Sequence, residues 1–373
     1  MNTYIPAEEE QILILGRTVK AVPLPLFWTA SGVEFVTDAA ELYFELETDY
    51  TVHEQWIRVE LDGYPLIRTA LAKGKTTLCA FRGLDASVKK RVRLIKEVQP
   101  MRIDPDNKLL LCAVHMDGRL YPLPQKTCKL EFVGDSITSG EGLASTRGTH
   151  VWAPAIFSTL GHYALRTAQE MDAELRILSQ SGWGAYCSWD NDPVRSLPPY
   201  YGQVCGVVKG EENERLGAFL QHDFSSWRPD AVVVNLGSND AFAFDNPAWV
   251  DESGNRFWMR READGSFAKE STDRFVLSVT RFLETLRACN PDSYLIWAYG
   301  MINVSMEPYI VEGVERYRGE SGDARAEYLA LPPLREEWTG ANDHPGQGSH
   351  EAAAQVLTKR LKALLAPQRA FSA

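Results

Sequence analysis

The N-terminal third of the chain alternates short apolar runs with turn residues. The pairs Asp62-Gly63 and Lys73-Gly74 separate several of these runs, and such spacing is typical of β-strands joined by tight turns. Many short strands with few helical stretches indicate an antiparallel β-sandwich or jelly roll, with one apolar face and one wet face to each sheet. The predicted strands are residues 12–15, 32–37, 42–46, 56–61, 76–81 and 92–98.

The pattern changes after a segment with two prolines at residues 121–126. Beyond it, buried-strand runs alternate with helical stretches, and this order predicts a parallel sheet covered by helices on both faces. We therefore predict two domains, a β-sandwich at residues 1–125 and an α/β/α domain at residues 126–373. Its predicted strands are residues 129–133, 175–179, 231–236 and 294–299, and its predicted helices are residues 152–171, 273–289 and 349–365.

Composition and charge narrow the function classes. A net charge of -11 and a pI near 5.3 disfavour a nucleic-acid partner, because a phosphate backbone is itself negative. The basic run at residues 89–93 lies in an alternating apolar pattern, so we interpret it as a solvated strand face. The start of the chain lacks a signal-peptide pattern and no run approaches a membrane span. We expect a cytoplasmic protein without membrane association.

Cofactor motifs do not occur in the sequence. The six cysteines lack CxxC spacing, and HExxH, P-loop and EF-hand patterns do not occur. We expect reduced, mostly buried thiols, and neither a metal ion nor a nucleotide cofactor.

A serine directly follows the first predicted strand of the second domain, in Gly134-Asp135-Ser136. In parallel sheets the carboxyl ends of the strands carry the reactive groups. The α/β-hydrolase pattern GxSxG requires a glycine where this chain has Thr138. Taken alone, Gly-Asp-Ser is equally compatible with a helix cap or a simple turn.

Further polar groups follow at other predicted strand ends and near the C-terminus. Gly182 follows the strand at 175–179, Asn239 follows the strand at 231–236, and His344 precedes the last helix. A glycine N–H and an asparagine amide can donate to a developing oxyanion. A histidine is the base that a serine hydroxyl requires.

These four blocks, in this order, resemble the SGNH (GDSL-like) hydrolase superfamily. The resemblance implies that Ser136 is the nucleophile and His344 the general base. It also implies an oxyanion hole formed by Ser136, Gly182 and Asn239, with Gly184 as the alternative glycine. The superfamily usually has an aspartate three residues before the histidine, where this chain has Ala341. A Ser-His dyad, or a triad completed by Asp343, Asn342 or a backbone carbonyl, remains open.

A β-domain of this size before an SGNH domain is similar to carbohydrate esterase family 2. The resemblance implies removal of acetyl groups from plant-type oligosaccharides, which are fragments of mannan, xylan or glucomannan. The expected binding partner is therefore the acetylated oligosaccharide substrate. Trp183 and Trp338 are our candidates for sugar-stacking platforms, and the alternative for each ring, which its large apolar area favours, is packing in the core.

Three alternatives stay open at this point. The catalytic blocks do not encode the alcohol side of the ester, so a lipase or thioesterase acting on a non-carbohydrate ester is possible. The missing acid could instead mark a carbohydrate-binding protein with a decayed hydrolase domain. The N-terminal sandwich could also bind polysaccharide as an independent module.

Overall fold

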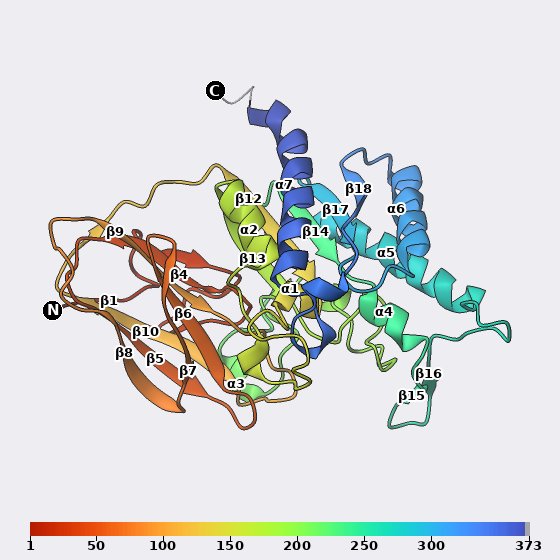
Figure 1. Cartoon of the computed structure of the whole chain (residues 1–373), viewed down its shortest axis with the longest axis horizontal. Helices are drawn as coiled ribbons and strands as arrows, with labels where there is room; N and C mark the ends of the chain where they lie inside the picture. The colour runs from red at the N-terminus through yellow and green to blue at the C-terminus, as the bar shows by residue number, and fades with distance from the viewer. Residues whose placement is uncertain (370–373) are drawn as a thin grey trace. The chain divides into compact units, whose positions relative to one another are not determined.

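The structure is a computed structural model that describes residues 1–369. The chain forms two compact units (Figure 1). The first unit comprises Met1–Lys126, Trp152–Thr159 and Gly202–His222, and the second comprises Thr127–Val151, Leu160–Tyr201 and the chain from Asp223 on. The segments 152–159 and 202–222, which the sequence assigned to the second domain, therefore belong to the first unit.

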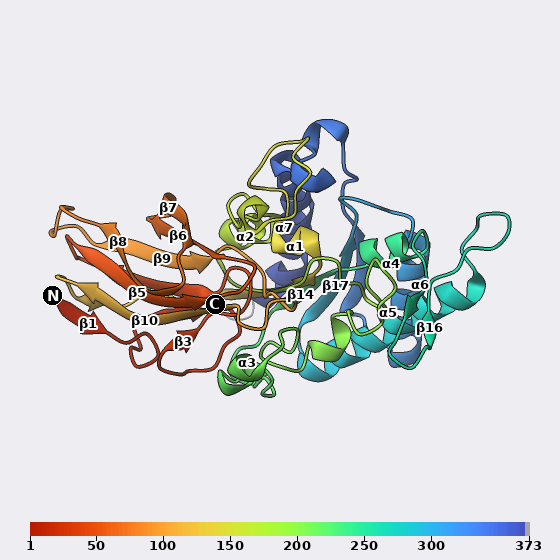
Figure 2. The ribbon, with the colours of Figure 1, turned by 90° about the horizontal axis from the view of Figure 1, so that it is seen from below.

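The first unit is the antiparallel β-sandwich that the sequence predicted. One sheet has the order β1-β10-β5-β8 with β3 on β10, and the other has the order β11-β4-β9-β6-β7 with β2 on β4. Figure 2 shows β6 and β7 in one layer and β1 and β10 in the other. The strands are β1 (Asn2–Tyr4), β2 (Leu13–Leu15), β3 (Leu24–Pro25), β4 (Gly32–Thr37), β5 (Leu42–Asp49), β6 (Gln55–Leu61), β7 (Tyr64–Leu71), β8 (Gly74–Phe81), β9 (Lys90–Lys96), β10 (Lys108–Met116) and β11 (Leu120–Tyr121), and the unit also holds the short helix α3 (Glu211–Arg215).

Alternation along the strands produces the core between the two sheets. In β5, Leu42, Phe44 and Leu46 are fully buried in the apolar cluster, and the residues between them are partly exposed. This period of two is what a half-buried strand requires. Two longer strands escaped prediction. The first half of β7 is exposed on both faces, and β10 is a continuous apolar run with a register shift between Leu111 and Ala113, so neither alternates cleanly.

The basic run at residues 89–93 is a solvated face only in part, because Lys89 is exposed whereas Lys90 and Arg93 are largely withdrawn from solvent. Lys90 is buried and donates to the carbonyls of Asp85 and Val88. Arg93 pairs with Glu60 at 3.0 Å and with Glu34 at 3.4 Å. Neighbouring strands thus supply carboxylates that compensate the basic run inside the protein, as buried charges require.

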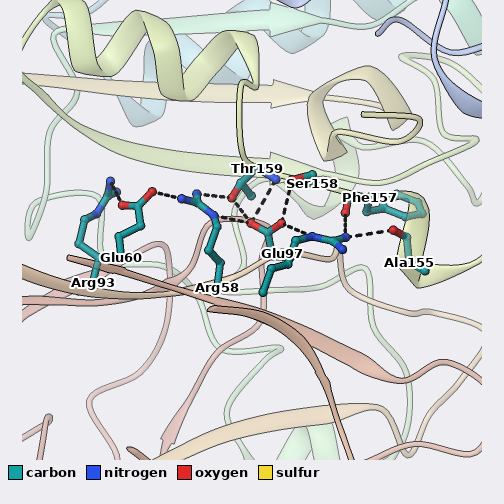
Figure 3. A network of polar contacts seen from close by, with 9 residues as sticks. Arg58, Glu60, Arg93, Glu97, Ala155, Phe157, Ser158 and Thr159 are labelled. Carbon is teal, nitrogen blue, oxygen red and sulfur yellow. Dashed lines mark hydrogen bonds and ion pairs between the residues drawn. The ribbon is translucent and has the colours of Figure 1, made fainter. Parts of the chain in front are cut away.

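The segment Trp152–Thr159 is fastened to this sheet by a buried carboxylate (Figure 3). Glu97 accepts from Arg58 Nε at 3.0 Å, Arg68 Nε at 3.1 Å and Ser158 Oγ at 2.9 Å, and also from the Thr159 hydroxyl. Burial alone would raise the pKa of Glu97, but Arg58 and the hydroxyl donors hold it below its ordinary value. The carboxylate is therefore ionised at neutral pH.

The helix predicted at residues 152–171 is wrong for its first half. The helix begins only at Tyr163, after His162, whose side chain accepts from the Ala164 N–H. Upstream, Arg68 takes up the carbonyls of Ala155 and Phe157 at 3.0 and 2.6 Å. Those carbonyls are therefore bonded to a side chain, and only a short turn (Pro154–Ile156) forms there.

Replacing Glu97 by glutamine is expected to destabilise the first unit by about 3 kcal/mol, because removing one partner of a buried ion pair leaves a charge uncompensated. Urea unfolding of the full chain measures this. Glu336→Gln is the matched control, since its pair with Arg147 is exposed and should contribute less than about 1 kcal/mol. Equal stability of the two variants would contradict a stabilising role for the buried network.

The second unit is the predicted parallel sheet with helices on both faces. Its strand order is β13-β12-β14-β17-β18, with α2 and α7 on one face and α5 and α6 on the other (Figures 1 and 2). The elements are β12 (Cys128–Gly134), α1 (Ser136–Ser139), α2 (Tyr163–Glu170), β13 (Ala173–Ser179), β14 (Ala231–Asn235), α4 (Ser238–Ala243), the hairpin β15 (Trp249–Val250) and β16 (Arg256–Phe257), α5 (Lys269–Cys289), β17 (Tyr294–Tyr299), α6 (Glu307–Ser321), β18 (Ala326–Ala330) and α7 (Gln347–Arg369).

The sheet places the catalytic blocks at one edge. Strand β12 lies between the parallel strands β13 and β14, and Gly134 is in register with Ser179 on one side and Asn235 on the other. Their carboxyl ends therefore deliver Ser136, Gly182 and Asn239 to the same end of the sheet.

Candidate active site

Ser136 lies at the junction between a buried strand and a short helix. β12 ends at Gly134, and Asp135 caps α1 by accepting from the Ile137 N–H at 3.0 Å. A Cβ at Gly134 would lie 2.0 Å from Thr138 Oγ1 and 2.8 Å from the Asn235 carbonyl oxygen, so only glycine fits this turn. As the first residue of the helix, Ser136 has a backbone N–H without an intrahelical acceptor.

His344 contacts Ser136 directly. The Nε2 atom lies 2.9 Å from Ser136 Oγ, and the Nδ1 atom lies 2.7 Å from the backbone carbonyl oxygen of Asn342. A carbonyl can only accept, so Nδ1 carries the proton and Nε2 is left to accept from the serine hydroxyl. The sequence placed both residues in the site, and the structure brings them into hydrogen-bonding contact.

The partner of Nδ1 is the backbone carbonyl, one of the three options that the sequence left open. Asn342 has a left-handed backbone with φ of 54°, and its N–H donates to the Thr149 carbonyl at 2.7 Å. This conformation aims the carbonyl of Asn342 at the imidazole. The Asp343 carboxylate lies 3.7 Å from His150 in an exposed pair, and so does not serve His344.

Two predicted donors of the oxyanion hole, the backbone N–H of Gly182 and the side-chain amide of Asn239, are both held in place. Gly182 has φ of +80°, and a Cβ there would lie 3.1 Å from the Trp189 ring. Asn239 Nδ2 donates to Asp135 Oδ2 at 3.2 Å and to the Trp183 carbonyl at 3.0 Å. Both amide hydrogens are therefore engaged, and an oxyanion would have to replace one of these acceptors.

Asp240, the neighbour of Asn239, organises the loop after Gly182. Its carboxylate accepts from the backbone N–H groups of Ala185, Tyr186 and Cys187 at 2.8, 2.7 and 3.1 Å. Gly184 lies against this carboxylate, because a Cβ there would be 2.3 Å from Asp240 Oδ2. Its tight packing explains the glycine at 184 without an oxyanion role.

Two buried acids lie behind the nucleophile. Burial raises the pKa of Asp135 to about 7 and the pKa of Asp240 to about 6. Their hydrogen bonds to backbone N–H groups oppose this shift in both cases. Asp135 is therefore only partly charged at neutral pH, which reduces the negative potential next to Ser136.

The sequence was wrong about one tryptophan and overlooked another. Trp183 is 3% exposed and packs on Tyr200 with ring centroids 5.4 Å apart, so its faces are not available to a sugar. Trp338 is half-buried and lies under the guanidinium of Arg335, 4.3 Å from the ring centroid. Trp189 is 47% exposed and packs directly on Gly182. It is the better candidate for a sugar platform.

Glu141 is a second residue that sequence reasoning missed. The buried carboxylate accepts from Asn342 Nδ2 at 2.9 Å and from Ser181 Oγ at 2.8 Å, and its Oε1 lies 3.7 Å from His344 Nε2. The available signal was its place in the same block as the nucleophile, directly after Gly140.

Residues 1–369 contain no group of three His, Cys, Asp or Glu side chains arranged to hold a metal ion. Within the same residues, every helix is too short or too polar to cross a bilayer. The side chains at this site themselves offer a hydroxyl activated by an imidazole, beside several N–H donors.

Comparison with known proteins identifies the group to which this fold and site belong. The acetyl xylan esterase Est2A of the rumen bacterium Butyrivibrio proteoclasticus is 40% identical, with a TM-score of 0.96 and 98% of both chains covered. A family two carbohydrate esterase from Clostridium thermocellum shares the fold, with 22% identity, a TM-score of 0.78, and coverage of 95% of this chain and 99% of the other. No family model matches the chain.

Curated relatives agree with the structural comparison. An acetylxylan esterase / glucomannan deacetylase of Cellvibrio japonicus is 22% identical over 97% of this chain and 91% of its own length. The cellulase/esterase CelE of Acetivibrio thermocellus is 24% identical over 90% of this chain, which spans only 37% of that protein.

The fold and the site define a carboxylic ester hydrolase of the SGNH type. Within that class the chain belongs to carbohydrate esterase family 2.

Proposed function

We propose that this protein removes acetyl groups from the hydroxyls of plant-type oligosaccharides, using Ser136 as nucleophile and His344 as base. The observation that carries the proposal is the contact of 2.9 Å between Ser136 Oγ and His344 Nε2, with Nδ1 fixed by a carbonyl. The 40% identity with an acetyl xylan esterase supports acetyl and carbohydrate as the two halves of the ester. An intact dyad disfavours a decayed hydrolase domain.

The first half of the reaction acylates the serine. The Ser136 proton moves to His344 Nε2 as Oγ attacks the acetyl carbonyl carbon. The oxyanion would be stabilised by the N–H groups of Ser136 and Gly182 and by Asn239 Nδ2, which exchanges one of its present acceptors for it. Collapse of the intermediate expels the sugar hydroxyl, which takes its proton from the imidazolium.

The second half releases acetate. A water molecule loses its proton to His344 Nε2 and attacks the acetyl-serine carbonyl, and Ser136 leaves with the returning proton. The Asn342 carbonyl holds Nδ1–H throughout, so the imidazole keeps its orientation while its charge changes.

Wild-type enzyme is expected to release acetate from acetylated xylo- and manno-oligosaccharides, and to hydrolyse p-nitrophenyl acetate faster than long-chain p-nitrophenyl esters. Parallel acetate assays and ester kinetics measure this. Equal or better activity on long-chain esters, with no acetate from the sugars, would favour a lipase or thioesterase and reject the carbohydrate assignment.

Replacing Trp189 by alanine is expected to raise KM for an acetylated oligosaccharide about tenfold, since one stacking contact is worth roughly 1 kcal/mol or slightly more. The kcat for p-nitrophenyl acetate should change little, because this small ester does not need a platform. Trp189→Phe, which keeps an aromatic face, is the matched control. A parallel loss on both substrates would indicate that Trp189 only supports Gly182.

The cytoplasmic location and independent sugar binding by the first unit stay predictions. If the protein is cytoplasmic, its substrates would be imported oligosaccharides.

A further inference from the structure

The carboxylate of Glu141 occupies the centre of the loops that build the site. Its backbone N–H donates to the Ser136 carbonyl at 3.1 Å, just past the left-handed Gly140 that ends α1. The side chain is buried, with 2% of the residue exposed. Its position relative to the nucleophile is therefore fixed by a short, hydrogen-bonded stretch of chain.

Each oxygen of Glu141 holds a different loop. Oε2 accepts from Ser181, the residue before Gly182, and Oε1 accepts from the side chain of Asn342, whose own carbonyl orients His344. The Glu141 carboxylate thus connects the loop that carries Gly182 to the loop that carries His344.

The charge of Glu141 also lacks an ordinary partner. Its hydrogen-bond donors, Ser181 and Asn342, are both neutral, and in residues 1–369 its one ion-pair contact is with His344, at 3.7 Å from Nε2. A buried carboxylate without a cation is unfavourable. Such a charge is compensated best when an imidazolium forms next to it.

We propose that Glu141 takes over the task of the missing triad acid, as a positioning residue whose negative charge stabilises the imidazolium of His344 from the Nε2 side. This inference rests on the proposed function, since it concerns the same proton transfer. In the usual triad the acid contacts Nδ1, which here already donates to the Asn342 carbonyl. A carboxylate on the other side adds the charge that a neutral carbonyl cannot supply.

Two other acids are chain neighbours of the dyad, Asp135 next to Ser136 and Asp343 next to His344. Asp135 is a like charge that interacts with Glu141, but burial raises the pKa of Asp135 to about 7, which reduces its negative charge at neutral pH. Asp343 is exposed and paired with His150. Glu141 is thus the acid that faces the reacting nitrogen.

Glu141→Gln tests the charge, because glutamine has the same shape and can still accept from Asn342. We expect kcat for p-nitrophenyl acetate to fall roughly ten- to a hundredfold, since a unit charge about 4 Å away in a partly buried site interacts strongly. KM should change less than about twofold. Single-turnover phosphonylation of Ser136 by a p-nitrophenyl phosphonate should slow in parallel, because it reports the attack of the activated serine without the deacylation step.

Three variants separate charge from structure. Ser181→Ala removes a hydrogen bond and keeps the charge, Glu141→Asp keeps the charge on a shorter side chain, and Glu336→Gln removes an exposed carboxylate from the Arg147 pair. Glu336→Gln should stay within about threefold of wild type, and both Ser181→Ala and Glu141→Asp should exceed Glu141→Gln in kcat.

The proposal is overturned if folded Glu141→Gln keeps more than half of the wild-type kcat, or if Glu141→Asp or Ser181→Ala is as slow as Glu141→Gln. Thermal melting establishes that each variant is folded. Failure of the proposed function has a different signature: Ser136→Ala would then stay active, or wild type would release no acetate from sugars while still cleaving the generic ester.

Discussion

Ser136→Ala is expected to lower the kcat for acetyl esters by about four orders of magnitude or more, because covalent catalysis is lost while the oxyanion donors remain. Ser136 Oγ is the hydroxyl that contacts His344 Nε2, so the substitution removes the group that the base activates. The variant should keep the fold, since the substitution removes one oxygen from a short helix whose cap is Asp135. Acetate release and melting temperature measure the two parts.

The matched control is Ser145→Ala. Ser145 lies nearby in the chain and donates to the Thr149 hydroxyl at 3.1 Å, but it does not contact His344. It should keep activity within about twofold of wild type. If Ser136→Ala retained more than about a hundredth of the wild-type kcat, an acyl-enzyme on Ser136 would be excluded.

Local pattern was sufficient for much of the fold. β4 and β17 have the bounds that the sequence predicted, residues 32–37 and 294–299, because each is a short run with one consistent burial pattern. Three of the four blocks, those with Ser136, Gly182 and Asn239, were found because parallel strands all end at the same edge of a sheet. The bounds of a strand and the polar residues that directly follow it can both be predicted from a few consecutive residues.

Polar pairing between distant segments could not be predicted in this way. Whether residues 152–159 form a helix depends on Arg68 and Glu97, which take up their carbonyls and hydroxyls from a distant part of the sequence. The basic residue Arg93 keeps only 16% of its side chain exposed because carboxylates on two other strands face it. In each case local propensity was overridden by a partner that the sequence does not place.

The acid of the site was missed for the same reason. The superfamily pattern predicts an aspartate three residues before His344, but in this chain the left-handed backbone of Asn342 decides which group meets the imidazole. Glu141 reaches His344 from the nucleophile block instead. The sequence could not distinguish the two tryptophans near Gly182, because the difference between them is their exposure. Trp183 is buried, and Trp189 is open to solvent.

His344→Ala is expected to lower kcat by about a thousandfold or more, because the serine hydroxyl then loses the base that contacts Oγ. Added imidazole should restore part of the activity, since the side chain is partly exposed and its removal leaves a space beside Ser136 that solvent can reach. Rates measured with and without imidazole on p-nitrophenyl acetate test this directly.

His150→Ala is the matched control, because His150 is exposed and pairs with Asp343 without contacting Ser136. It should leave kcat within about twofold. The double variant Ser136→Ala/His344→Ala should be no slower than the slower single variant, because a nucleophile and its base act as one unit. Additive losses in the double variant would mean that the two residues work in separate steps, and the contact between Oγ and Nε2 would then not be the proton-transfer path.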